Sequence, residues 1–246
     1  MSSTTPLLIL QEQGNSLLIG TDATILYPTR QTKKTEFDQV MQEIRPVSLT
    51  LVRPADHKSG RSTEAELFRS YSSLQSVWIT ESGLMAAYAV NIGTGIVVEK
   101  QDDFFIVTFV SDYTSANVES TNIEDELGSC IWSGLAKVLK SSEKRRAFLD
   151  NILTVWPVNN EQIEAALKPF LGVSGVLPDV LPTTVKFRAF PEYLSESCKE
   201  AKLVDDSGIV LEGVKAMERC LGWCGAAITS KTIFTDARSY ASRPIQ

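Results

Sequence analysis

The chain has 246 residues, of which 43% are hydrophobic and 22% charged, and its formal net charge is −6. This balance is typical of a folded globular protein and excludes a mostly disordered chain. The acidic charge argues against a protein that coats nucleic acid, and no apolar run reaches the roughly 18–20 residues that a membrane-spanning helix needs. The first residues, MSSTTPLLILQEQG, have no basic region, so we expect no signal peptide.

The N-terminal third alternates between strand and helix patterns. Residues 7–19 (LLILQEQGNSLLI) predict two short strands around a Gly14-Asn15 turn, which is a hairpin signal. The following segments are, in order, a polar stretch over 31–34, a short helix over 36–44, a strand over 47–52, a helix over 62–71, and residues 76–89, which begin as a strand and end as a helix.

The middle of the chain contains the strongest hairpin signal. Strands over 93–99 and 104–110 are separated by the polar turn Lys100–Asp103, and residues 112–122 predict a loop. The remaining predicted elements are helices over 123–139 and 142–149, a strand over 152–156, a helix over 161–171 capped by Asn159 or Asn160, a strand over 185–190, and helices over 209–221 and 225–234. Hairpins mixed with strand–helix units predict an α/β fold.

The cysteines and the single histidine offer little chemistry. Cys130, Cys198, Cys220 and Cys224 form no CxxC pair, and with only His57 available a Cys/His zinc site cannot be assembled. We therefore expect buried, reduced thiols. His57 lies in a polar, turn-like stretch, and GxSxG, P-loop and HExxH motifs are absent, so we expect no catalytic histidine.

Residues 45–98 are similar to a known family. Without a gap, they align with the actin segment that runs from HPVLLTE through REKMTQIMFE to LYASGRTTGIV, and they match it at Pro46-Val47, Leu49-Thr50, Arg61, Phe68, Tyr88-Ala89 and Thr94–Val97. Shorter stretches follow in the family's order, among them Leu7–Gly20 with actin's first phosphate hairpin and Trp223–Ile228 with WIGGSIL. The chain therefore resembles the actin-related proteins, most clearly over 45–98.

The resemblance implies an actin-like fold of ribonuclease H-like lobes, reduced to subdomains 1 and 3. Subdomain 2 has no room between Pro28 and Arg45, and subdomain 4 has none between Val110 and Gly128. We expect a subdomain 1-like lobe over 1–125, a subdomain 3-like lobe over 126–225, and a segment over 226–246 that returns to the first lobe.

The family's nucleotide-binding residues are replaced. The Asp of the first phosphate loop matches Gln11, its turn retains Gly14, and Leu17 or Leu18 stands where the family has a Lys. The second loop, Asp-Ser-Gly-Asp-Gly, matches Glu99-Lys100-Gln101-Asp102-Asp103, without glycines that would admit a phosphate. Ser82 matches the water-positioning Gln, and Leu153–Pro157 replaces the Gly-Gly-Thr turn. We expect no ATP binding, no metal and no catalysis.

The resemblance implies a structural subunit that contacts actin-like or actin-related proteins. In an actin filament the lower subdomains form the barbed-end face and the upper ones much of the pointed-end face, so a chain without upper lobes could end a filament. We expect it to cap the pointed end of the actin-like mini-filament of dynactin, in the cytoplasmic cytoskeleton. The expected contact residues lie in the lower cleft, an apolar slot suited to a helix: Ile131, Leu135, Gly225 and Ile228.

Three alternatives remain open. The chain could be the actin-related subunit of a nuclear chromatin-remodelling or acetyltransferase complex that binds a helix of the large subunit. It could also be an active ATPase or sugar-kinase relative, or an unrelated α/β interaction protein. For the dynactin subunit and for the chromatin-complex subunit alike, we expect no direct contact with nucleic acid and no membrane span.

Overall fold

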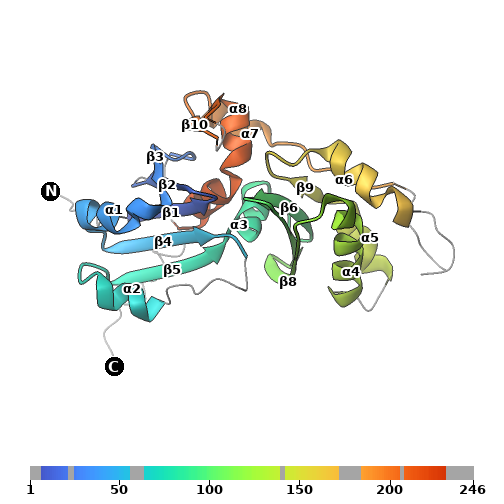
Figure 1. The fold of residues 1–246 in the computed structure, drawn as a ribbon, viewed down its shortest axis with the longest axis horizontal. Helices are drawn as coiled ribbons and strands as arrows, with labels where there is room; N and C mark the ends of the chain where they lie inside the picture. The colour runs from blue at the N-terminus through green and yellow to red at the C-terminus, as the bar shows by residue number, and fades with distance from the viewer. Residues whose placement is uncertain are drawn as a thin grey trace.

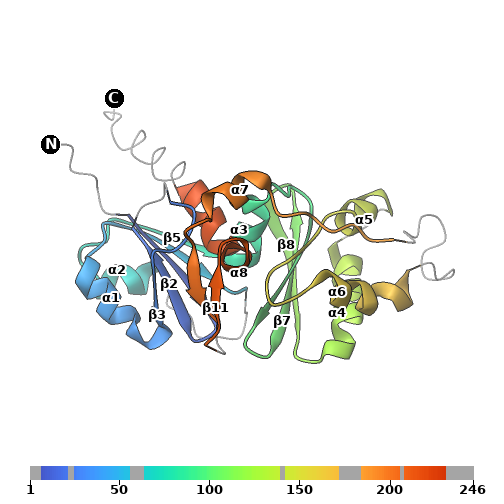
Figure 2. The ribbon, with the colours of Figure 1, turned by 90° about the horizontal axis from the view of Figure 1, so that it is seen from above.

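The structure is a computed structural model that describes residues 7–21, 25–55, 64–138, 142–171, 184–205 and 208–230, without the side chains of 142–145. Two sheets stand side by side, each with helices on its outer face, and further helices lie between them (Figures 1 and 2). The predicted α/β class is confirmed.

The first sheet has five strands in the order β3-β2-β1-β4-β5. These are β1 (Leu7–Gln13), β2 (Ser16–Gly20), β3 (Arg30–Lys33), β4 (Ser48–Arg53) and β5 (Ser76–Glu81). β1, β2 and β3 pair antiparallel, whereas β1, β4 and β5 pair parallel. The predicted hairpin over 7–19 is confirmed, and β3 is a strand where the sequence predicted only a polar stretch.

The second sheet repeats this order and these directions. Its strands are β6 (Gly95–Gln101), β7 (Phe104–Ser111), β8 (Thr114–Thr121) and β9 (Ile152–Thr154), in the order β8-β7-β6-β9. β6, β7 and β8 pair antiparallel and β6 pairs parallel with β9, which makes a parallel bridge to Phe187 in the place of a fifth strand. The predicted strand over 185–190 is reduced to this bridge.

The predicted loop over 112–122 is wrong, because most of it is β8. β8 is an edge strand that pairs with β7 alone among the described strands, and most of its side chains are exposed or half-buried. A strand of this kind tolerates a polar sequence, which is why the apolar periodicity expected of a strand is missing.

Helices cover the outer face of each sheet. The first sheet packs against α1 (Phe37–Ile44) and α2 (Glu64–Ser70) around Leu10 and Leu49. The second sheet packs against α4 (Leu127–Val138), α5 (Ser142–Leu149) and α6 (Asn160–Leu167) around Phe109 and Phe148. As predicted, Asn159 caps α6 by accepting a hydrogen bond from the backbone N–H of Gln162 at 2.8 Å.

The central layer contains α3 (Ser82–Ala89) and a helix over 221–230, and its core draws residues from both sheets. The two helices approach closely at Gly225, where a Cβ would lie 1.8 Å from the carbonyl oxygen of Met85. Trp223 of the same helix is fully buried against Gly20 of β2. This layer therefore joins the two sheets into one core.

The division between the sheets differs from the predicted boundaries. β6, β7 and β8 belong to the same sheet as β9, so the second sheet begins near residue 95 rather than after residue 125. The helix over 221–230 belongs to the layer between the sheets, across the predicted boundary at 225. The polar sequence of β8 concealed the repeated sheet and hence the boundary.

Residues 192–219 form a compact segment that the sequence did not predict. It contains α7 (Glu192–Ser197), the hairpin β10 (Lys202–Val204) and β11 (Val210–Glu212), and α8 (Val214–Arg219), in orange in Figure 2. The predicted helix over 209–221 is wrong in its first part, where Val210–Glu212 form β11, and α8 begins only after Gly213, whose φ of 58° lies outside the right-handed helical region. None of the helices within the described ranges is long and apolar enough to cross a membrane.

Candidate functional site

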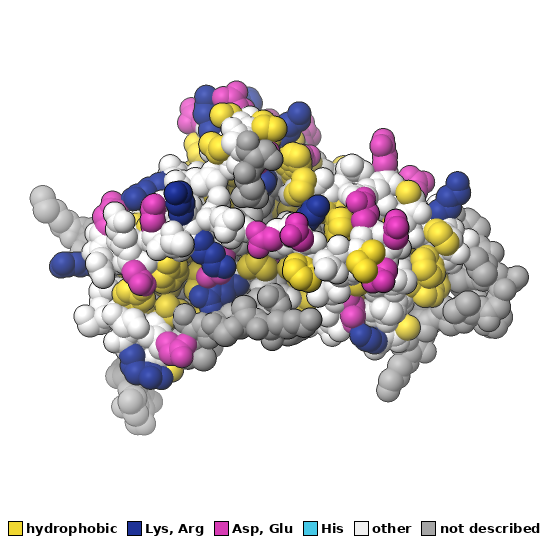
Figure 3. Space-filling view, viewed as in Figure 1, with side chains coloured by type: hydrophobic (Ala, Val, Ile, Leu, Met, Phe, Trp, Pro, Cys, Tyr) yellow, Lys and Arg dark blue, Asp and Glu magenta, His cyan; other side chains and the backbone are white. Residues whose placement is uncertain are grey.

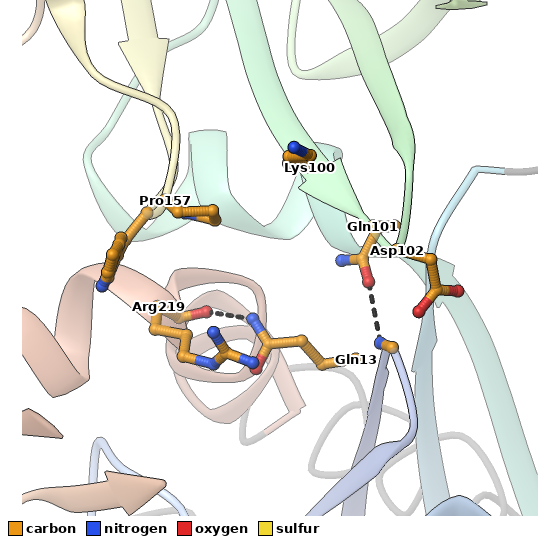
Figure 4. A pocket seen from close by; sticks show the side chains of 8 residues that line it. Gln13, Lys100, Gln101, Asp102, Pro157 and Arg219 are labelled. Carbon is orange, nitrogen blue, oxygen red and sulfur yellow. Dashed lines mark hydrogen bonds between the residues drawn. The ribbon is translucent and has the colours of Figure 1, made fainter. Parts of the chain in front are cut away.

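The tips of two equivalent hairpins face one another at the centre of the molecule. β1 and β2 are joined by Gly14-Asn15, and β6 and β7 by Asp102-Asp103. Gly14 and Asp102 have φ values of 54° and 53°, so the two turns begin alike. The backbone N–H of Gly14 donates to Oε1 of Gln101 at 3.0 Å, which bonds one tip directly to the other (Figure 4).

α8 closes the gap beside the tips. Nε2 of Gln13 donates to the backbone carbonyl of Arg219 at 2.7 Å, and both side chains are buried (Figure 4). The space that remains is a cavity of about 200 Å³, lined by Gln13, Gly14, Lys100, Gln101, Asp102, Trp156, Pro157 and Arg219. The protein's own side chains thus bridge the two lobes.

A buried polar layer lies behind the tips. The hydroxyl of Ser82, at the start of α3, donates to Oε1 of Glu99 at 2.5 Å, and both residues are almost wholly buried. Gln11 is also buried. Gly222 packs closely against both Gln11 and Ser82, since a Cβ at Gly222 would lie 3.1 Å from the Gln11 amide nitrogen and 3.1 Å from the carbonyl oxygen of Ser82. The helix over 221–230 therefore packs into this layer.

Burial dominates the titration of Glu99. The pKa of this carboxyl is raised from 4.5 to about 7, mainly by the loss of hydration and to a smaller extent by the nearby Glu81 carboxylate. Hydrogen bonds from Ser82 and Gln101 favour the charged form but only partly offset the effect of burial. At neutral pH a substantial fraction of Glu99 is therefore protonated.

The arrangement is poorly suited to phosphate. The Gly14 N–H is already used by Gln101, and the second tip carries Asp102 and Asp103 where a phosphate would need donors. Lys100 is exposed and its ammonium lies 5.2 Å from the centre of the Phe105 ring. No cluster of three or more metal-ligating side chains occurs among the described residues.

The positions matched to the family's nucleotide-site residues lie on the two hairpins and at the start of α3. Gln11 and Gly14 lie on the first hairpin and Glu99 and Asp102 on the second, and Ser82 bonds to Glu99 between them. The four cysteines are free thiols, of which Cys198, Cys220 and Cys224 are buried. Burial raises the pKa of Cys130 to about 11 and that of Cys224 to about 12, so these thiols are poor nucleophiles. His57 lies outside the described residues.

The expected partner-contact residues do not form a surface. Ile131 and Leu135 of α4 are buried in the core on the outer face of the second sheet. Gly225 is buried against α3, and only Ile228 is half-buried, at the edge of the central core. The prediction is corrected here: the apolar face of α4 covers its own sheet rather than the cleft.

A tyrosine pair at the other end of α3 and β7 was missed. The ring centroids of Tyr88 and Tyr113 are 5.5 Å apart, and the Tyr88 hydroxyl donates to the backbone carbonyl of Tyr113 at 3.1 Å. Asp112 and Tyr113 form the β7–β8 turn with φ values of 51° and 58°, a conformation that is costly for a tyrosine. Tyr113 is nevertheless 40% exposed. Tyr88 was one of the family-matching residues, so that match was the available signal.

Neither the comparison with protein-family models nor the comparison with curated proteins finds a match for this chain.

Proposed function

We propose that this chain is a non-catalytic, actin-like structural subunit of a multiprotein complex. The observation that carries the proposal is the repeated sheet order on either side of a central helical layer, combined with hairpin tips that bond to each other. In the actin family the same two hairpins hold the nucleotide phosphates from opposite sides. Here Gly14, Gln101 and Gln13 use their hydrogen-bonding groups within the protein.

The actin-like part of the proposal is a fold of subdomains 1 and 3 alone. The family inserts subdomain 2 between the third strand of the first sheet and the following helix, and subdomain 4 at the equivalent point of the second sheet. In this chain β3 runs through a single turn at Lys34–Glu36 into α1, and β8 runs through Glu124–Glu126 into α4. Neither junction contains an additional lobe.

The proposed role is to cap the pointed end of the actin-like mini-filament of dynactin in dynein-based transport. A subunit that keeps its lower face and has no upper lobes offers one filament contact and cannot accept a further subunit. We place the contact at the Tyr88–Tyr113 pair, because it lies at the end of α3 and β7 opposite the hairpin tips. An exposed aromatic side chain held at an unfavourable φ is the kind of residue that interfaces use.

The test is affinity capture of the tagged full chain from its native cells, with mass spectrometry of the bound proteins. The variant Tyr113→Gly removes the ring and relieves the positive φ, so it should fold normally. Phe104→Ser, at the other end of β7, removes an exposed ring and serves as the matched control.

We expect the native chain and Phe104→Ser to capture actin-like filament and dynein-associated subunits, and Tyr113→Gly to lose at least nine-tenths of them. Capture of a remodelling ATPase and other nuclear subunits instead would overturn the dynactin assignment. Unchanged capture by Tyr113→Gly would overturn the assigned contact.

A further inference from the structure

The β10–β11 hairpin has one edge that is blocked and one that is open. Residues Asp205 and Ile209, and residues Ala201 and Gly213, are bonded across the hairpin through their backbones. By the alternation of an antiparallel pair, the backbone groups of Val204 and Val210 therefore point away from the partner strand. The Gln31 side chain confirms this for Val204, because its amide nitrogen donates to the Val204 carbonyl at 2.8 Å and its oxygen accepts from the Val204 N–H at 2.9 Å.

No described residue covers the outer edge of β11 in the same way. The sheet that it forms with β10 has only these two strands within the described ranges. The outward N–H and C=O groups of Val210 and Glu212 therefore form an unpaired edge, which is a template for a further strand. Two apolar side chains stand beside it, since Ile209 is 60% exposed and Val210 is 58% exposed. On this projection at the top of Figure 3, hydrophobic side chains are visible among Lys, Arg, Asp and Glu side chains.

A groove of about 600 Å³ runs beside this edge. One wall is formed by Ile209 and Leu211 with Lys215 and Glu218 of α8, and the other by the chain from Thr154 to Asn160, which includes Trp156 and Val158. Alternate side chains of a strand added to β11 would share the face of Ile209 and Leu211 and enter the groove.

We propose that β11 and this groove bind an extended, uncharged, apolar segment of a partner protein as an added β-strand. The inference does not depend on the identity of the complex proposed above. Backbone hydrogen bonds to Val210 and Glu212 supply the register, and the groove between β11 and Trp156 selects apolar side chains.

The charges around the groove favour an uncharged occupant. Glu212 is paired with Lys202 at 2.7 Å, and Oδ1 of Asp205 accepts the N–H of Ile209 at 2.8 Å. Burial raises the pKa of Glu218, and the nearby Lys215 only partly offsets this. With these charges satisfied within the chain, a charged segment would gain no counter-charge and would lose hydration.

The size of the edge favours a peptide segment over a second copy of the chain. β11 has three residues, so its edge is about 10 Å long at the usual strand rise. A stable interface between two folded proteins buries about 800 Å² and 20–30 residues on each side. An edge of this length can pair with a segment of about three to five residues, which is too little for an interface between two folded copies.

The experiment is titration of the isotopically labelled full chain with capped nine-residue peptides, followed by NMR. The probes are a peptide of alternating valine and threonine, one of alternating leucine and serine, and one of alternating lysine and threonine. We expect saturable shifts at the Val210 and Glu212 amides and the Trp156 indole with the two apolar peptides and none with the lysine peptide. Slower hydrogen exchange at the Val210 and Glu212 amides should accompany binding.

Two proline variants separate strand addition from general contact. Val210→Pro removes an outward donor from the open edge, where proline is tolerated, and should weaken peptide binding at least about tenfold. Val204→Pro removes the equivalent donor on the edge blocked by Gln31 and should leave binding unchanged. Folding of both variants is checked by the dispersed amide spectrum of the first lobe.

Three binding results would overturn the proposal. They are no saturable shift with either apolar peptide, equal weakening by the two proline variants, and saturable shifts at the groove with Mg-ATP in place of peptide. Concentration-dependent dimerisation that Val210→Pro abolishes would assign the edge to a second copy and would also overturn it.

Discussion

The two sheets share one topology but differ where their hairpins end. Gln11, Glu12 and Gln13 at the end of β1 correspond to Glu99, Lys100 and Gln101 at the end of β6, because each strand is followed by a two-residue turn. In the first lobe Glu12 is buried and bonds to Arg53 of β4 at 2.8 Å.

In the second lobe the corresponding Lys100 is exposed and lies over the Phe105 ring. The buried carboxyl group of this lobe is that of Glu99, one residue earlier, in the layer between the sheets. The equivalent hairpin ends therefore differ. The first lobe has an ion pair between Glu12 and Arg53, whereas in the second lobe Glu99 accepts a hydrogen bond from Ser82 of the central layer. The two lobes therefore place different chemistry at the ends of equivalent hairpins.

The largest predicted effect concerns the layer that holds the lobes together. Gly225→Ala places a Cβ where the Met85 carbonyl oxygen lies, so α3 and the helix over 221–230 must separate. We expect a loss of about 3 kcal/mol in the free energy of unfolding, measured with urea, although alanine is the better helix former. Ser133→Ala on the exposed face of α4 is the control and should change stability by less than about 0.5 kcal/mol. Equal stability of the two variants would refute the close approach.

The ion pair of the first lobe gives the next effect. Arg53→Met leaves Glu12 with only the half-exposed Lys34, whose ammonium lies 2.8 Å from Oε2. We expect a loss of about 2 kcal/mol in urea denaturation, below the range for a fully orphaned charge because Lys34 remains. Lys100→Met in the second lobe is the matched control and should cost about 0.5 kcal/mol or less. A similar cost in both lobes would remove the contrast between them.

Glu99 makes the free energy of unfolding fall as the pH rises, whereas a carboxyl group whose pKa is lowered by folding makes it rise. Its pKa is raised to about 7 by burial, so the folded state binds a proton that the unfolded state has released above pH 4.5. Stability from this group is present at pH 5 and is lost as the pH rises through 7. We expect the unfolding free energy to fall by about 2 kcal/mol more between pH 5 and pH 8 in the native chain than in Glu99→Gln. Parallel pH profiles for the two proteins would contradict the burial of this carboxyl.

The bond between the tips gives the smallest effect. Gln101→Leu removes the acceptor for the Gly14 N–H and should cost about 1 kcal/mol, with faster hydrogen exchange at that amide. Gln75→Leu changes an exposed glutamine in the same way and should leave the Gly14 amide unaffected. If exchange at Gly14 is the same in both variants, the tips are not bonded in solution.

The sequence predicted the fold best where apolar residues alternate. Both central hairpins, β4, β5 and most helices were predicted because their buried faces have a clear period. The edge strands β3 and β8 were missed because half-exposed strands need no apolar pattern. The segment over 192–219 was misassigned because its short strands and helices are separated by Gly208 and Gly213, whose left-handed φ values no local pattern revealed.

The candidate site was chosen from the resemblance rather than from a periodic pattern. Gln11, Gly14, Glu99 and Asp102 were named because they match the family's phosphate-loop positions, and the structure places the first two on one hairpin and the last two on the other. The bonds from Gln101 to Gly14 and from Gln13 to Arg219 join residues far apart in the chain and had no local signal. Ile131 and Leu135 were assigned to a surface because an apolar helix face looks the same whether it meets a partner or its own sheet.

The most direct test of the account is calorimetric titration of the full chain with ATP and magnesium up to millimolar concentrations. The account predicts no saturable heat, because the tips bond to each other and present carboxyl groups where phosphates would bind. Gln101→Leu, which frees the Gly14 N–H, should behave in the same way because Asp102 and Asp103 remain. A one-to-one binding isotherm for the native chain would contradict the proposal that its own side chains occupy the space between the hairpin tips and leave no nucleotide site there.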